Sequence, residues 1–187
     1  MKKSRLITLA LSALCAACVY GPQQVRVAPE LHLTQAIDGA GKTVRLSVAD
    51  ERASKSLGQT DEGADFTLQG KLPNVIESAI RTALEKQGFI VARTSRKTAA
   101  NLHVEIMDLE YNVKPGFIFK AIRADSRINA ICKTSSGKDF VRLYTGRLEK
   151  TVFFLGKDGN GEYLSTAVSK AIDKLLNDQD MGACLVE

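Results

Sequence analysis

Residues 101–113 read N-L-H-V-E-I-M-D-L-E-Y-N-V, and residues 117–133 read F-I-F-K-A-I-R-A-D-S-R-I-N-A-I-C-K. Apolar and polar side chains alternate along both stretches, which predicts two long strands that each bury one face. In the first stretch the apolar phase changes after Ile106, which indicates a β-bulge. A Pro-Gly pair between the stretches marks a turn. The two strands decide the fold, because other elements must cover their apolar face.

The polar side of the 117–133 strand carries charged or amide side chains at alternate positions. They are Arg123, Asp125, Arg127 and Asn129, with Lys120 nearby. A solvated sheet face is the simplest interpretation of such a row. The functional interpretation is a binding face for a partner, either an envelope protein or a lipid or glycan component whose phosphate groups would contact the arginines. The sequence leaves both interpretations open.

Further elements surround these two strands. Alternation predicts strands at residues 30–34, 44–48, 88–93 and 140–154. Apolar residues at three- and four-residue steps predict two amphipathic helices, one between Pro73 and Gly88 and one over about 161–177. The second helix is interpreted as a lid on the sheet. We therefore expect an α+β two-layer sandwich, a mostly antiparallel sheet with two amphipathic helices packed on one face.

The N-terminal residues have the pattern of a targeting segment. Three basic residues precede an apolar run at 6–14, which is too short to span a bilayer, and the pattern predicts a signal peptide over residues 1–17. Small residues before Cys18 resemble the lipobox of a bacterial lipoprotein, although Cys15 stands where a leucine is usual. The resemblance implies N-acyl and S-diacylglycerol chains on Cys18. An ordinary signal peptide cut near Ala17, which would leave a free thiol, is the alternative.

The chain after the signal peptide divides into two parts. Residues 18–29 contain two prolines, a glycine and two glutamines, which predicts a short flexible tether that carries the lipid. Residues 30–187 have the length of a single α+β periplasmic domain. Val19 follows Cys18 where an aspartate would favour retention at the inner membrane, so we expect a lipid anchor at the periplasmic face of the outer membrane.

Charge and composition argue against nucleic acid as a partner. The formal net charge is +5, but three of the 26 basic residues lie in the signal peptide and none of the 21 acidic residues does. The mature chain is therefore close to neutral. A nucleic-acid-binding domain needs a concentrated basic face or aromatic stacking groups, and this sequence has no Trp and only 6% aromatic residues.

Two cysteines and one acidic residue have predicted structural roles. Cys132 and Cys184 lack C-x-x-C spacing and can form a disulfide in an oxidising periplasm, or remain two separate thiols. Asp50 falls on the apolar phase of its strand, where a buried carboxylate needs a partner. Arg52 is the nearest candidate for an ion pair. A solvated strand end is the alternative for Asp50.

The sequence gives no support for catalysis. His32 and His103 are the only histidines, and both alternate with apolar residues, as surface side chains of strands do. There is no G-x-S-x-G, no H-E-x-x-H and no phosphate-binding glycine loop. Residues 158–162 lack the ligand spacing of a calcium loop and are interpreted as a turn. We therefore expect no enzyme activity, no metal and no cofactor apart from the covalent lipid.

Four motifs carry a family resemblance. V-A-P-E-L-H-L at 27–33, V-R-L-S-V-A-D-E-R-A-S-K-S-L-G at 44–58, I-E-S-A-I-R-T-A-L-E-K-Q-G-F-I-V at 76–91 and A-N-L-H-V-E-I at 100–106 resemble the YajG-like family of uncharacterised bacterial outer-membrane lipoproteins. The resemblance implies a lipid-anchored lipoprotein and brings no catalytic residues. The expected function is that of a periplasmic binding or assembly-accessory lipoprotein, and a structural subunit of an envelope complex is the alternative.

Overall fold

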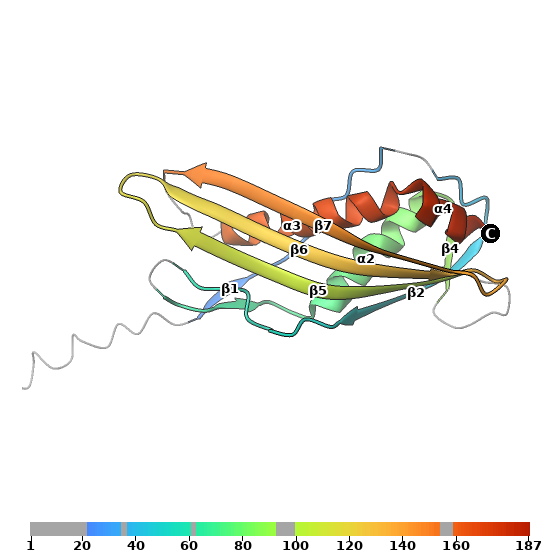
Figure 1. Ribbon diagram of the computed structural model, residues 1–187, viewed down its shortest axis with the longest axis horizontal. Coiled ribbons are helices and arrows are strands. Elements are labelled where there is room, and N and C mark those ends of the chain that lie inside the picture. The colour runs from blue at the N-terminus through green and yellow to red at the C-terminus, as the bar shows by residue number, and fades with distance from the viewer. Residues whose placement is uncertain (1–21, 35–36, 61–62, 93–99, 154–158) are drawn as a thin grey trace, which may run out of the picture.

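A computed structural model describes residues 22–34, 37–60, 63–92, 100–153 and 159–187. The elements are β1 (Gln23–Val25), β2 (Thr43–Asp50), β3 (Phe66–Leu68), α2 (Leu72–Lys86), β4 (Ile90–Ala92), β5 (Ala100–Lys114), β6 (Lys120–Lys133), β7 (Asp139–Val152), α3 (Gly159–Leu176) and α4 (Gln179–Val186). Five strands form one sheet in the order β4-β2-β5-β6-β7, and α2 and α3 cover one face of it (Figure 1). The predicted α+β fold is confirmed.

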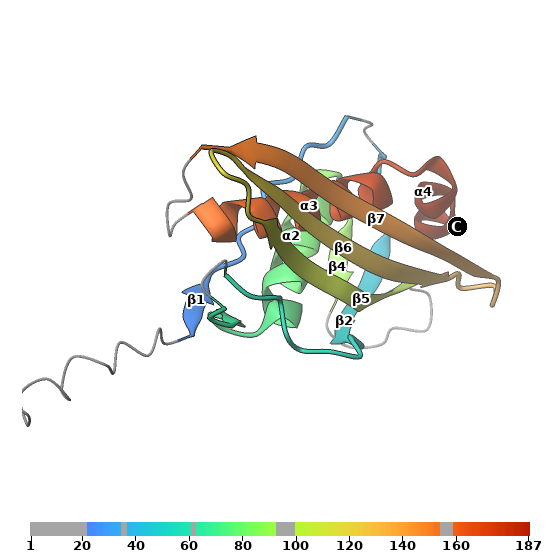
Figure 2. The same ribbon diagram turned by 60° about the vertical axis from the view of Figure 1, so that its left-hand side comes forward.

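The three long strands form the antiparallel part of the sheet, and they lie side by side in Figure 2. β5 pairs with β6 from Asn101↔Lys133 to Lys114↔Ala121, and β6 pairs with β7 over its whole length. The register shifts between Ile106 and Asp108, which confirms the predicted bulge. β2 runs parallel to β4 and to β5, so the sheet as a whole is mixed.

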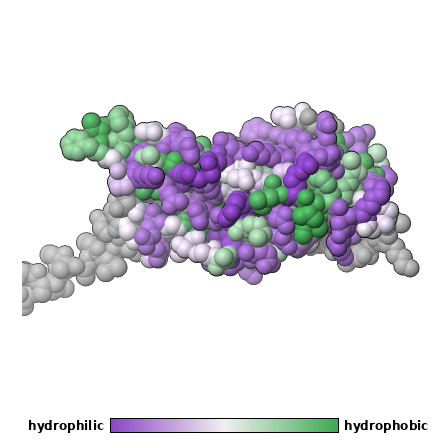
Figure 3. Space-filling view, in the orientation of Figure 1, coloured by the Kyte–Doolittle hydropathy of each residue, from purple (hydrophilic) through white to green (hydrophobic). Residues whose placement is uncertain are grey.

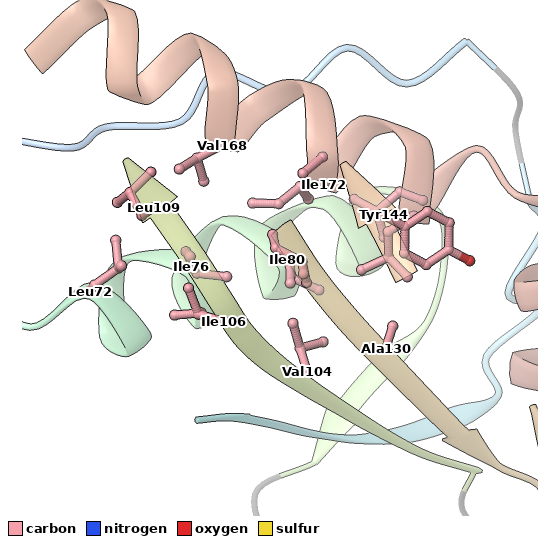
Figure 4. Close-up of a cluster of buried hydrophobic side chains, with 14 of the residues drawn as sticks. Leu72, Ile76, Ile80, Val104, Ile106, Leu109, Ala130, Tyr144, Val168 and Ile172 are labelled. Atoms are coloured by element: carbon pink, nitrogen blue, oxygen red, sulfur yellow. The ribbon is translucent and has the colours of Figure 1, made fainter. Parts of the chain in front are cut away.

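The core lies between the sheet and the two long helices. Figure 4 shows its centre, where side chains of α2, β5, β6, β7 and α3 meet: Leu72, Ile76, Ile80, Val104, Ile106, Leu109, Ala130, Tyr144, Val168 and Ile172. The four-residue spacing of Ile76 and Ile80 puts both on one side of α2, facing alternate residues of the strands. Full burial of an aliphatic side chain contributes about 1.5–3 kcal/mol, so this layer dominates the stability of the fold.

Helix α3 lies unusually close to β7 at Gly146. A Cβ atom on this glycine would lie 1.9 Å from the carbonyl oxygen of Ala167 and 2.7 Å from the backbone nitrogen of Ala171. Two lysines of α3 also reach the edge of the sheet, where Lys174 Nζ donates to the Thr145 carbonyl and Lys170 Nζ to the Arg147 carbonyl. Because β7 is an edge strand, these lysines occupy carbonyls that another chain could otherwise pair with.

The segment that precedes β2 differs from the prediction. Gln23–Val25 form β1, which pairs in parallel with β3, and Val25 and Val27 are buried. The folded domain therefore begins inside residues 18–29, which were expected to be a flexible tether. Residues 30–34 are extended but form no strand, so the strand predicted there is wrong.

Helix α3 supplies the hydrogen bonds that a sheet would otherwise give to this extended segment. Four alternate backbone N–H groups donate to side chains spaced four residues apart, three on α3 and the fourth on the residue directly after it: Ala28 to Ser165, Glu30 to Ser169, His32 to Asp173 and Thr34 to Asn177, all at 2.8–2.9 Å. Two extended residues advance about 6.7 Å and four helical residues advance about 6 Å, so the two repeats match over this length. Helix packing thereby replaces the expected strand pairing.

Helix α4 was not predicted, because the last element expected from the sequence was the helix over about 161–177. Asp178 caps it by accepting hydrogen bonds from the backbone nitrogens of Asp180 and Met181. Met181, Cys184 and Leu185 are buried. This i, i+3, i+4 spacing behind an aspartate cap is a helix signal, but it covers only two turns and is easily missed.

Candidate functional site

The uncovered face of the sheet holds most of the side chains that the sequence singled out. Arg123, Asp125, Arg127 and Asn129 alternate along β6 with buried residues, so they project from the face opposite the helices. Lys120 has the phase of the buried Ile122 and is therefore not part of this row. We call the exposed side of β5, β6 and β7 the outer face; it is toward the viewer in Figure 3, where most of its surface is hydrophilic.

Both arginines of the predicted row are paired with carboxylates. Arg123 Nε donates to Asp125, which also accepts a hydrogen bond of 2.6 Å from Arg147 Nε on β7. Arg127 Nη2 donates to Asp108 of β5 at 2.8 Å. Burial raises the pKa of Asp125, but the hydrogen bonds from the two arginines outweigh it and hold this pKa below its usual value. The positive charges that would bind a phosphate are thus already balanced.

The polar network continues across the sheet toward β2. Asn129 Nδ2 donates to Glu105 Oε2 at 2.8 Å, and Glu105 lies 3.6 Å from His103 Nε2. His103 Nδ1 in turn lies 2.8 Å from Ser47 Oγ on β2. These side chains hold one another in fixed positions, which gives the outer face a rigid, charge-balanced surface.

An apolar patch lies beside this network. Ile131 is directly paired with Val141, and Leu143 is paired with Asn129, so the three apolar side chains are neighbours on β6 and β7. Val141 is 57% exposed and Leu143 is 55% exposed. We call Ile131, Val141 and Leu143 the sheet patch. The alternation of residues 140–154 already puts Val141 and Leu143 on the same face of a strand. The sheet patch was nevertheless not predicted, because only the polar row of β6 was considered as a binding face.

Asp50 and Arg52 form an ion pair at the end of β2, away from the sheet patch. Arg52 Nε donates to Asp50 Oδ1 at 2.9 Å and Arg52 Nη2 to Asp50 Oδ2 at 3.0 Å, while Lys55 Nζ lies 3.0 Å from the same carboxylate. The Arg52 side chain is only 3% exposed. The hydrogen bond from Arg52 lowers the pKa of Asp50 to about 2, although burial opposes this shift. The pair fixes the start of the loop that follows β2.

Replacing Asp50 with asparagine is expected to lower the free energy of unfolding by about 3 kcal/mol, because it leaves the buried Arg52 charge without its partner. The pKa of Asp50 lies below its unfolded value of 3.8, so its stabilisation is present above about pH 4 and is lost as the pH falls toward 2. Urea unfolding between pH 7 and 2 measures both effects. Asp139→Asn, which removes an exposed pair with Lys133, is the control. If the free energy of unfolding of Asp50→Asn fell as much between pH 7 and pH 2 as that of the wild type, this role of Asp50 would be contradicted.

The structure joins Cys132 of β6 to Cys184 of α4 in a disulfide. The bond thus ties the unpredicted helix to the centre of the sheet. Cys18 and residues 1–17 lie outside the described residues, as does Asp158, the first residue of the turn predicted at 158–162. Gly159–Glu162 form the first turn of α3.

Among the residues that the structure describes, no group of three or more His, Cys, Asp or Glu side chains is placed to hold a metal ion. Within the same ranges no helix is long and apolar enough to cross a membrane.

Residues 29–185 match the family Lipoprotein_16, described as an uncharacterized lipoprotein, and the chain belongs to this family. It is accordingly a membrane-anchored bacterial lipoprotein, a class defined by lipid modification. The family carries no indication of catalysis.

Similarity to known structures extends over most of the domain. Protein XCC0632 from Xanthomonas campestris has 13% identity and a TM-score of 0.55, and the match covers 87% of this chain and 95% of that one. A minor lipoprotein from Acinetobacter baumannii has 14% identity and a TM-score of 0.45, with 78% and 90% covered. No curated protein matches the sequence. At these identities the likeness to XCC0632 supports the fold and not a function.

Proposed function

We propose that this chain is a non-catalytic lipoprotein, anchored at the periplasmic face of the outer membrane, that binds an envelope protein through the outer face of its sheet. N-acyl and S-diacylglycerol chains on Cys18 would hold it there. The lipoprotein family supports the anchor, and the small residues before Cys18 together with Val19 after it support its position and the choice of membrane.

The observation that carries the binding proposal is the sheet patch. Val141 and Leu143 keep more than half of their surface exposed on a face that α2 and α3 leave open. An apolar centre bordered by polar, mutually paired side chains is the usual anatomy of a protein interface. Exposed apolar groups in contact with one another also mark interaction surfaces in general.

The paired charges favour a protein over a lipid or glycan partner. Recognition of phosphate groups would require Arg123 and Arg127 to leave Asp125 and Asp108, respectively. A protein surface, in contrast, can contact the sheet patch and leave these ion pairs intact. A structural subunit of an envelope complex would use the same surface, and would differ by remaining bound in fixed stoichiometry through purification.

A photo-crosslinking amino acid at Leu143 tests this proposal in living cells. We expect one main protein adduct, and we expect Val141→Asp to reduce its yield about tenfold because a charge would enter the apolar contact. The matched control places the same crosslinker at Glu85, an exposed position on α2. Equal adducts from both positions, or adducts only with lipid or glycan, would contradict a protein-binding outer face.

A further inference from the structure

A second exposed apolar cluster lies at one end of the molecule, far along the strands from the sheet patch. Phe117, Ile118 and Phe119 form the turn between β5 and β6, and Phe153 follows β7. Phe117 is fully exposed, Phe153 is 71% exposed, and the Phe119 and Phe153 rings lie 5.9 Å apart. We call these four residues the aromatic tip. It projects as a green, hydrophobic group at the left end of Figure 3.

The composition of the aromatic tip is unlike that of an ordinary hairpin turn, which is polar. The turn spans residues 115–119, and a Cβ on Gly116 would lie 2.3 Å from the Phe119 carbonyl oxygen. The backbone is therefore folded tightly while three consecutive large apolar side chains face solvent. Large exposed apolar groups at one place indicate contact with a protein or a membrane.

The N-terminal end of the folded domain lies at the same end of the molecule. Gln23 of β1 accepts a hydrogen bond from Asn160, and Asn160 accepts one of 2.6 Å from the Tyr111 hydroxyl. Tyr111 precedes Lys114, the last residue of β5, by three residues, which is about 10 Å along a strand. Figures 1 and 2 both show β1 and the β5–β6 turn at the same end of the domain.

Chain length places the predicted lipid close to this end. Pro22, the first described residue, lies four Cα-to-Cα steps after Cys18, with three residues between them. A fully extended chain of four residues spans at most about 14 Å. An acylated Cys18 would therefore hold the β1 end of the domain, and with it the aromatic tip, at the bilayer surface.

We propose that the aromatic tip inserts into the membrane that holds the lipid anchor, as a second, protein-made contact. This inference rests on the proposed lipidation of Cys18. Lys114 lies at the end of β5 next to the aromatic tip, and Lys150 lies near the end of β7 next to it. Both are exposed, so they would meet anionic headgroups. Two attachment points would fix the orientation of the domain and turn the sheet patch away from the lipid.

Tryptophan fluorescence tests the insertion directly, because the chain contains no Trp. The lipidated full-length mature protein with Phe117→Trp is reconstituted into vesicles of phosphatidylethanolamine and phosphatidylglycerol, with or without brominated acyl chains. We expect about a twofold loss of emission with brominated chains, since the indole would lie among them. Leu143→Trp in the sheet patch is the matched control, and its emission should not change.

The outcomes separate the tip from the anchor. If the protein floats with the vesicles but the indole of the Phe117→Trp variant is not quenched, or that of the Leu143→Trp control is quenched instead, the tip does not insert and the anchor stands. If the reconstituted protein does not float with the vesicles, both the anchor and the insertion are contradicted. Quenching in Phe117→Trp that disappears when Phe119→Asp is added supports insertion through the whole tip.

Discussion

Gly146→Ala is expected to lower the free energy of unfolding by about 3 kcal/mol or more, and Gly146→Val is expected to prevent folding. The added Cβ would lie 1.9 Å from the Ala167 oxygen and 2.7 Å from the Ala171 nitrogen. Both atoms belong to the backbone of α3, so no side-chain rotation can relieve the collision. The helix would have to move away from β7, and its contacts with the core would loosen.

Urea denaturation of Gly146→Ala measures this effect, and Gly159→Ala provides a matched control. A Cβ at Gly159 would meet only the Tyr163 ring, at 3.4 Å or more, and the residue begins the same helix. The control should therefore be neutral or stabilised by up to about 1 kcal/mol. Equal denaturation midpoints for wild type and Gly146→Ala would show that α3 does not cross the sheet at this point.

Removing the disulfide is expected to have the second large effect. The double variant Cys132→Ala and Cys184→Ala should lose about 4 kcal/mol of stability, because the bond closes a loop with a sequence separation of 52 residues. The loss should concentrate at the C-terminus, since α4 is otherwise held by its buried Met181 and Leu185 and by hydrogen bonds to Asp178.

Thermal unfolding with and without a reductant is the measurement. Reduction should lower the midpoint of the wild type to that of the double variant and leave the double variant unchanged. Hydrogen exchange should show faster exchange in α4 than in β5 and β6 after reduction. A wild-type midpoint that does not respond to reductant would contradict a stabilising bond between β6 and α4.

The long strands and helices were predictable because their patterns are local. Alternation over 101–113 and 117–133 gave β5 and β6, and even the bulge after Ile106 appeared as a change of phase. The strand predicted at residues 30–34 was wrong because its hydrogen-bond partner is not local in the sequence. Their alternation is real, but the partner that completes it is a row of polar side chains on α3, about 140 residues away in the sequence.

The candidate site was predictable only in part. Strand phase correctly placed Arg123 and Arg127 on the outer face of β6. The sequence could not show that Asp108 and Arg147 complete their network, because those contacts depend on the register of β5 and β7 and on the bulge. The closeness of the aromatic tip to the N-terminal end likewise depends on where β1 packs.

Lipid on Cys18 is the feature on which both proposed membrane contacts depend. Mass spectrometry of the N-terminal peptide, from the chain purified out of the membrane fraction of producing cells, tests it most directly. The peptide should begin at Cys18 and carry one diacylglycerol and one N-linked acyl chain. A peptide that begins at another residue, or one that contains an unmodified Cys18, would contradict the lipid anchor.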